Sequence, residues 1–136
     1  MVSYSIAERR AIGAFYAGKL KAVGIRSTPK LLECAGTPKA RRQLADVAGI
    51  PPEHILRWAK LADLMRIRGV AEDYAELLTA AGADTVKELA RRNAARLVAR
   101  MNELNERKKI VDLLPSEKRV ARWIEEAKAL PPMITY

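Results

Sequence analysis

The strongest constraint on the fold is an internal repeat, in which residues 10–32 align with residues 68–90 at a constant offset of 58. Seven of the 23 aligned positions are identical, well above chance for unrelated segments. Tyr16, Ala17, Leu20 and Gly24 match Tyr74, Ala75, Leu78 and Gly82 in the same order. A repeat with fixed spacing predicts two copies of one supersecondary unit.

The repeat extends into the later part of each copy, where it places one tryptophan. Trp58 and Trp123 lie at an offset of 65, so the second copy holds about seven extra residues, which we expect between Glu103 and Leu114. We therefore divide the chain into units of residues 1–65 and 66–136. Residues 59–68 are predicted to continue as a helix into the second unit, so the two units are expected to pack as one body.

The composition favours helices over strands. Hydrophobic residues make up 49% of the 136 residues, but aromatic residues make up only 5%. A core must then be built mostly from Ala, Leu, Ile and Val, whereas strands favour aromatic and β-branched residues. The composition and the helix boundary signals together predict an all-α fold of about nine short helices.

Helix boundaries are marked by capping residues, prolines and glycines. Side chains of Ser, Thr, Asp and Asn accept amides at a helix start, often with proline at the first helical position. The expected N-caps are Thr28, Thr37, Asp84, Asn93 and Ser116. Glycine takes the left-handed conformation that ends helices, and Gly24, Gly49 and Gly82 are expected there. After one turn near Ile6, the expected helices cover residues 14–23, 28–35, 38–48, 52–65, 72–81, 85–92, 94–107 and 117–130.

Each copy begins with a small-residue turn that leads into a helix. Ala11-Ile12-Gly13 and Gly69-Val70-Ala71 form these turns. Glycine permits a sharp turn that brings amides to the surface, and a helix start attracts anions through its dipole. The turn and its helix resemble the helix-hairpin-helix motif, and this resemblance implies contact with one nucleic-acid phosphate. Each turn has lost one glycine of the motif, and alanine is strained wherever φ must be positive.

The whole chain resembles a bacterial family of tandem helix-hairpin-helix proteins that carries only a domain-of-unknown-function label. The resemblance covers roughly residues 4–136, including the ending Ala127-Lys128-Ala129-Leu130-Pro131-Pro132. It implies the all-α fold and the paired hairpins, and it implies no specific activity.

The two turns differ in charge, which favours the first as the binding site. Glu72 and Asp73 follow the second turn and would repel a phosphate, so that hairpin is expected to be structural. The amides of Ala11, Ile12 and Gly13 are predicted to hold a phosphate at the first turn. The cations expected around it are Arg9, Arg10, Lys19 and Lys21. Such contacts position a protein on the backbone without reading bases.

Three further basic clusters are candidate phosphate contacts, although each is also explained as a solvated helix face. Lys39, Arg41 and Arg42 lie at one helix start, Arg91, Arg92, Arg96 and Arg100 form a helical stripe, and Arg107-Lys108-Lys109 form a loop cluster. Trp58 and Trp123 are candidates for stacking on bases. Their matched positions late in apolar helices favour the alternative, that both are core residues.

The sequence gives no indication of catalysis, a metal or a cofactor. It has one histidine, His54, one cysteine, Cys34, and no recognisable nucleophile, phosphate loop or metal-ligand set. Signal and membrane-spanning patterns are not found, so we expect a cytoplasmic protein.

Two functions fit these features. The net charge of +9 permits nucleic-acid binding, so the first hypothesis is sequence-nonspecific, non-enzymatic binding of nucleic acid, most simply DNA. The alternative is a protein-interaction module in which the hairpins are purely architectural. The segment 133–136 would then dock on a partner, or it covers the core of its own chain.

Overall fold

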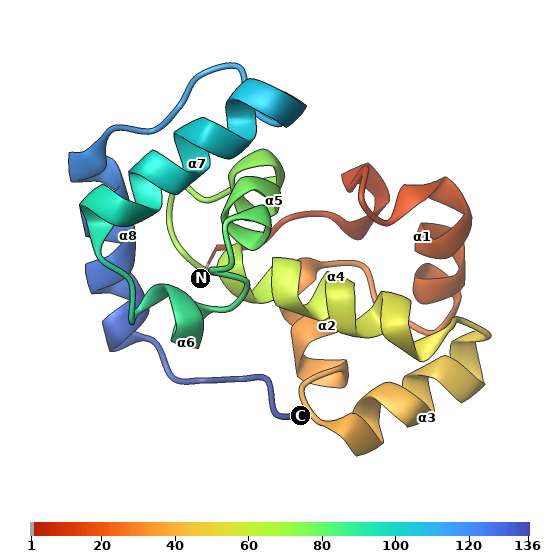
Figure 1. The fold of residues 1–136 in the computed structure, drawn as a ribbon. Coiled ribbons are helices and arrows are strands. Elements are labelled where there is room, and N and C mark those ends of the chain that lie inside the picture. The colour runs from red at the N-terminus through yellow and green to blue at the C-terminus, as the bar shows by residue number, and fades with distance from the viewer. Residues whose placement is uncertain (1) are drawn as a thin grey trace. The chain divides into compact units, whose positions relative to one another are not determined.

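The computed structural model describes residues 2–136, which fold as one 3₁₀-helix, η1, and eight α-helices without a β-strand (Figure 1). The chain forms two units, one of the described residues up to Arg66 together with Met133–Tyr136, and one of Ile67–Pro132. The all-α prediction is confirmed for the described residues. The boundary lies close to the predicted one, but residues 133–136 join the first unit instead of the second.

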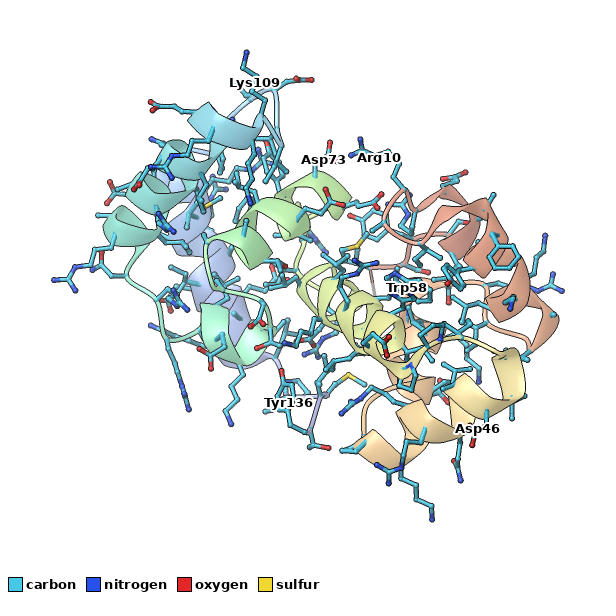
Figure 2. The ribbon with its side chains drawn as sticks, turned by 45° about the vertical axis from the view of Figure 1, so that its right-hand side comes forward. Arg10, Asp46, Trp58, Asp73, Lys109 and Tyr136 are labelled. Carbon is cyan, nitrogen blue, oxygen red and sulfur yellow. The ribbon has the colours of Figure 1, made fainter. Side chains whose placement is uncertain are left out.

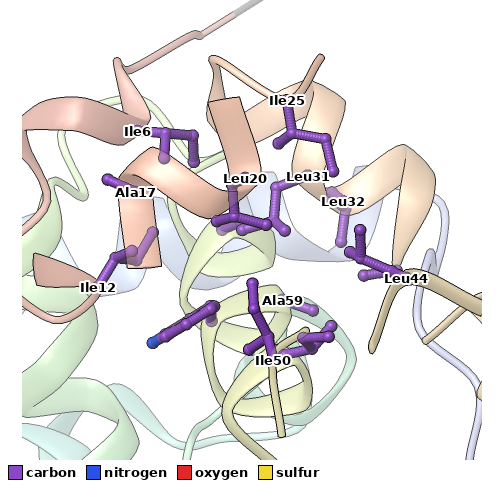
Figure 3. Close-up of a cluster of buried hydrophobic side chains, with 14 of the residues drawn as sticks. Ile6, Ile12, Ala17, Leu20, Ile25, Leu31, Leu32, Leu44, Ile50 and Ala59 are labelled. Carbon is purple, nitrogen blue, oxygen red and sulfur yellow. The ribbon is translucent and has the colours of Figure 1, made fainter. Parts of the chain in front are cut away.

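The first unit contains η1 and the first four α-helices. Their bounds are η1 Ile6–Glu8, α1 Gly13–Ala22, α2 Thr28–Cys34, α3 Pro38–Ala48 and α4 Pro52–Leu64. Helix α4 packs against α2 and α3, while α1 packs against η1 and α3. Leu20, Leu31 and Leu44 are among the aliphatic side chains that fill the space between them (Figure 3). Helix α4 ends at Leu64, so the predicted extension toward residue 68 is not formed.

The segment before α1 is held by backbone pairing with the loop before α2. The Ile6 amide donates to the Arg26 carbonyl at 3.0 Å, and the Thr28 amide donates to the Tyr4 carbonyl at 2.9 Å. An isolated antiparallel bridge joins Ser5 and Ser27 between these two bonds. This pairing brings the loop that contains Arg26 beside the start of the chain.

Residues 133–136 form a tail that is fixed to the first unit, which favours the prediction that they cover their own chain. The Thr135 amide donates to the Gly36 carbonyl at 2.8 Å. Ile134 packs against the hydrophobic core, and the Lys60 ammonium lies 5.4 Å from the centre of the Tyr136 ring. The tail also passes so close to Gly36 that a Cβ atom there would lie 2.6 Å from the Met133 carbonyl oxygen.

Gly36→Ala is therefore expected to displace the tail. A backbone oxygen at 2.6 Å from the new carbon must move, so the Thr135 amide should exchange with solvent deuterium faster than in the wild-type chain. Gly18→Ala is the matched control, because a Cβ at Gly18 in helix α1 has no neighbour within 4 Å. Equal exchange of the Thr135 amide in both variants would contradict this account of the tail.

The second unit contains the remaining four helices. Their bounds are α5 Glu72–Ala80, α6 Val86–Leu89, α7 Ala94–Lys108 and α8 Glu117–Ala129. Helix α8 packs against α6 and α7, and α5 packs against α7 (Figure 1). Helix α7 has fifteen residues against eleven in α3, and a loop follows it up to Ser116. The extra residues of the second copy therefore lie where the sequence predicts them.

The repeat is visible in the side-chain packing of both units. The ring centres of Tyr16 and Trp58 lie 5.3 Å apart, and those of Tyr74 and Trp123 lie 5.4 Å apart, with similar tilts. Trp58 is 1% exposed and Trp123 is 3% exposed. The prediction that both tryptophans are core residues is thus confirmed.

The backbone at the end of the first helix is also repeated. After α1, the amides of Gly24 and Ile25 bond back to carbonyls of the helix, and Gly82 and Ala83 do the same after α5. Gly24 and Gly82 have nearly equal positive φ, +89° and +93°. The predicted role of these glycines in ending helices is confirmed.

Five of the eight α-helices begin at a side-chain N-cap, and the sequence misplaces two of these caps by one residue. Thr37, Asn93 and Ser116 cap helices α3, α7 and α8 as predicted. Ser27 caps α2 instead of Thr28, and Thr85 caps α6 instead of Asp84. The hydroxyl of Thr28 instead accepts the amide of Tyr4 at 3.2 Å.

The two turns do not carry the alanine strain that the motif comparison predicts. Positive φ falls on the glycine that each turn retains, Gly13 at +80° and Gly69 at +89°, although these occupy different positions of the repeat. Ala71 has extended backbone, and in the described residues the only non-glycine with positive φ is Lys109. The two turns therefore have different backbone paths.

Candidate nucleic-acid interface

Three amides of the first turn were predicted to hold a phosphate, and two of them form hydrogen bonds within the turn itself. The amides of Ile12 and Gly13 both donate to the Arg9 carbonyl, at 3.2 and 3.0 Å. Ile12 itself is buried, and the Ala11 carbonyl accepts a hydrogen bond of 3.2 Å from Nε1 of Trp58. Contrary to the prediction, the Ile12 and Gly13 amides already have a carbonyl acceptor.

The next amides along α1 occupy the place where a helix start leaves donors. Ala14 and Phe15 follow Gly13, and the first amides of an α-helix lack intrahelical acceptors. The first turn of α1 contains no acidic residue, whereas the first turn of α5 contains Glu72 and Asp73. The charge difference between the two hairpins that the sequence predicts is therefore present at these helix starts.

Two of the predicted cations serve contacts inside the first unit. The Arg9 side chain is only 14% exposed, and its Nε donates to the Ser5 carbonyl at 3.0 Å. Nζ of Lys19 donates to the Gly49 carbonyl at 2.9 Å and lies 4.8 Å from the centre of the Phe15 ring. Lys19 thus supplies a cation to the C-terminal end of α3, a favourable position in the helix dipole.

Arg41 is buried, contrary to its predicted role as a surface contact. Its guanidinium donates to the carbonyls of Ala35 at 3.0 Å, Gly36 at 3.2 Å and Thr135 at 2.7 Å. Burial lowers the pKa of Arg41, and the charge at Tyr136 acts in the opposite direction. The side chain stays charged, as arginine does in proteins, and it joins the tail to the end of α2.

The exposed cations among the predicted residues are Arg10, Lys21, Lys39 and Arg42. Figure 2 shows Arg10 projecting from the turn before α1. Lys21, near the end of α1, lines a surface hollow of about 220 Å³ together with Arg26. Ser5 and four apolar residues form the rest of its described lining, which contains no acidic residue.

Sequence reasoning missed Arg26. It lies in the loop between α1 and α2, outside the helix that carries Lys21, and no periodic pattern connects the two residues. The pairing of residues 4–6 with residues 26–28 brings this loop to the edge of the hollow. The sequence signal that could have identified it is the repeat, because Arg26 aligns with the acidic residue Asp84. The two copies therefore differ in charge at this position.

Positive charge is concentrated in the first unit. Residues 1–66 and 133–136 hold twelve basic and five acidic residues, whereas residues 67–132 hold thirteen and eleven. The cluster Arg107-Lys108-Lys109 ends helix α7 and is exposed, and Figure 2 labels Lys109 at this end of the helix. Cations are stabilising at a helix C-terminus, so this cluster has a structural explanation.

The described residues 2–136 contain no group of three or more metal-ligating side chains. None of the helices within this range combines the length and the hydropathy that crossing a bilayer requires.

Comparison with known proteins gives a family and no described function. A family model, Domain of unknown function (DUF4332), matches residues 10–130. Comparison with curated proteins and with solved structures finds no significant match. The matched segment includes both turns, both tryptophans and all eight α-helices, and the chain therefore belongs to the DUF4332 family.

Proposed function

We propose that the first unit binds the phosphate backbone of nucleic acid, most simply DNA, without reading its sequence. The observation that carries the proposal is the hollow beside α1, where Lys21 and Arg26 meet on a unit with a large excess of basic residues. Arg10, Lys39 and Arg42 are the further exposed contacts. Phosphate contacts of this kind supply affinity that depends on salt and not on base sequence.

The repeat supports the interpretation of both copies as helix-hairpin-helix motifs. In the first copy the amides of Ala14 and Phe15 take the place of the predicted donors, since the earlier two amides bond to Arg9. The second copy carries Glu72 and Asp73 at the corresponding helix start. Its hairpin is thus architectural, and the proposed contacts of this function lie on the first unit.

A titration with short duplex DNA at several salt concentrations tests the proposal. The logarithm of the affinity falls as the logarithm of the salt concentration rises, and each phosphate contact makes this slope steeper by about 0.9. Lys21→Glu/Arg26→Glu removes two cations, so the slope should fall by roughly 2 and binding at about 50 mM salt should weaken at least tenfold. Arg9→Glu is unsuitable as a test, because Arg9 holds the Ser5 carbonyl.

Lys30→Glu/Arg57→Glu is the matched control, since it makes the same change in net charge at two exposed positions of the first unit. It should lower affinity much less than the Lys21/Arg26 pair and should leave most of the slope. Circular dichroism must show that both variants are folded. Undetectable binding by the wild-type chain at about 50 mM salt would refute the proposal, and so would equal losses in the two variants.

One observation favours the alternative, a protein-interaction module. Phe15 on α1 and Val47 on α3 are 70% and 72% exposed, so the first unit presents two large apolar side chains to solvent. In this alternative, Phe15→Ser would abolish partner binding, and the Lys21/Arg26 substitutions would leave it intact. The DNA titration separates the two functions, because the alternative predicts no salt-dependent binding.

A further inference from the structure

Four arginines surround one surface hollow of the second unit, at the start of helix α7. The hollow has a volume of about 290 Å³, and it is lined by Arg91, Arg92, Arg96 and Arg100. Ala81, Asn93 and Leu97 complete its described lining, which includes no acidic residue. We infer that this arginine hollow binds phosphate groups, independently of the basic surface of the first unit.

Two of the four arginines lie just before α7, and two lie in its first turns. Arg91 and Arg92 follow the short helix α6, and Asn93 then caps α7 by accepting the Arg96 amide at 3.0 Å. Arg92, Arg96 and Arg100 are spaced by four residues, so the side chains of Arg96 and Arg100 share one face of the helix. The first turn of α7 carries no acidic residue, and the helix dipole adds to the positive potential.

Arg92 is held in position by the glycine that ends α5. Its Nη2 donates to the Gly82 carbonyl at 2.6 Å. A Cβ atom at Gly82 would lie 3.3 Å from the same nitrogen, so glycine permits this close approach. Fixing one guanidinium before the ligand arrives lowers the ordering cost of binding.

The local charge balance favours an anion with at least two negative charges. Glu88 lies 3.7 Å from Arg91 and 3.9 Å from Arg92, and Glu103 lies 3.3 Å from Arg100. Arg96 forms no ion pair with any described acidic residue. Two carboxylates against four guanidiniums leave a local excess of positive charge, and such exposed ion pairs are weak.

Guanidinium groups hold phosphate oxygens through paired hydrogen bonds, which are stronger than those between neutral groups. A phosphate ligand would therefore displace the weak contacts with Glu88 and Glu103. Two sources of this chemistry fit the hollow: a free polyphosphate such as pyrophosphate, or successive phosphates of a nucleic-acid backbone.

The repulsion between these arginines lowers the stability of the helix, so the melting temperature provides a second measurement. Like charges four residues apart destabilise a helix, and the exposed Arg96 side chain contributes no ion pair among the described residues. Arg96→Glu would place a carboxylate at the third helical position, where it completes a capping box with Asn93. It would also face Arg92 and Arg100 with the opposite charge. We expect an unchanged or higher Tm together with a loss of phosphate binding.

The experiment uses the whole chain and two probes, at an ionic strength held constant with chloride. Calorimetry with inorganic pyrophosphate should show saturable binding by the wild-type chain, weakened at least about tenfold by Arg96→Glu because guanidinium–phosphate bonds are charge-assisted. Lys118→Glu is the control, because it makes the same change in net charge at an exposed position of the second unit that does not line the hollow. It should retain wild-type affinity for pyrophosphate.

Fluorescence anisotropy with a labelled single-stranded DNA distinguishes the two sources. If DNA affinity also falls in Arg96→Glu and not in Lys118→Glu, the hollow accepts backbone phosphates. If only pyrophosphate binding falls, the ligand is a free polyphosphate. Absence of pyrophosphate binding to the wild-type chain, or equal losses in both variants, would overturn the inference. The Lys21/Arg26 variant should keep full pyrophosphate binding, so this site and the proposed function can fail separately.

Discussion

Trp58→Ala is expected to lower the free energy of unfolding of the first unit by roughly 3–5 kcal/mol, the range for truncating a buried aromatic side chain to alanine. Trp58 is almost fully buried and lies among the aliphatic core of its unit. Its ring lies 5.3 Å from Tyr16 and is stacked on His54 at 5.8 Å. Truncation would leave a cavity between α1 and α4.

The same substitution would also remove the donor for the first turn. Nε1 of Trp58 donates to the Ala11 carbonyl, so the turn before α1 is held by the core of its own unit. Trp58→Phe should cause a smaller loss of stability, because it keeps one aromatic ring in the core and loses the hydrogen bond and only part of the ring volume.

Denaturant unfolding followed by circular dichroism measures both variants. Trp123 is the other tryptophan of the chain, so fluorescence of the Trp58→Phe variant reports on the second unit alone. Phe15→Ala is the matched control, since this aromatic side chain is largely exposed, and its stability should stay within about 0.5 kcal/mol of wild type. A Trp58→Ala chain as stable as this control would contradict the packing described above.

Arg41→Met is expected to destabilise the first unit by roughly 2–4 kcal/mol and to release its tail, because hydrogen bonds from a charged donor contribute about 1.5–3 kcal/mol. The guanidinium joins the carbonyls of Ala35, Gly36 and Thr135. Methionine keeps the unbranched stem of the side chain but donates no hydrogen bond. Arg41→Lys should not restore stability, since an ammonium lacks the planar fork that reaches several acceptors.

Chemical denaturation gives the loss of stability, and limited proteolysis detects the released tail. Arg42→Met is the control, because Arg42 is the next residue in the chain and its side chain is exposed. The two variants should behave in opposite ways toward DNA. Arg42→Met should reduce the salt dependence of binding with little effect on stability, whereas a folded Arg41→Met chain should keep it. Retained stability and an intact tail in Arg41→Met would refute the structural role of Arg41.

The helical framework follows from local sequence signals. N-caps at Thr37, Asn93 and Ser116 accept amides three residues away, so their effect is encoded within one turn. The shifted caps, Ser27 and Thr85, occupy matched positions of the repeat. At both starts two polar residues compete for the cap, and contacts with other segments, such as the bond between Thr28 and Tyr4, decide between them.

The candidate site was less accessible to sequence reasoning. Arg10 and Lys21 are exposed as expected, but Lys19 bonds to a carbonyl thirty residues away. Arg26 joins Lys21 only because two distant backbone segments pair. A count of basic residues predicts the charge of a unit but not which side chains face solvent.

The sequence by itself determined the all-α fold, the repeat and the two core tryptophans, because capping and periodic apolar positions act over a few residues. It also determined the charge contrast between the two hairpins, since Glu72 and Asp73 directly follow the second turn in the sequence. Only the tertiary structure decided that Arg41 is buried, because the Thr135 carbonyl that it binds lies 94 residues away. Exposure depends on which distant segment covers a side chain, and no local signal of the sequence contains that information.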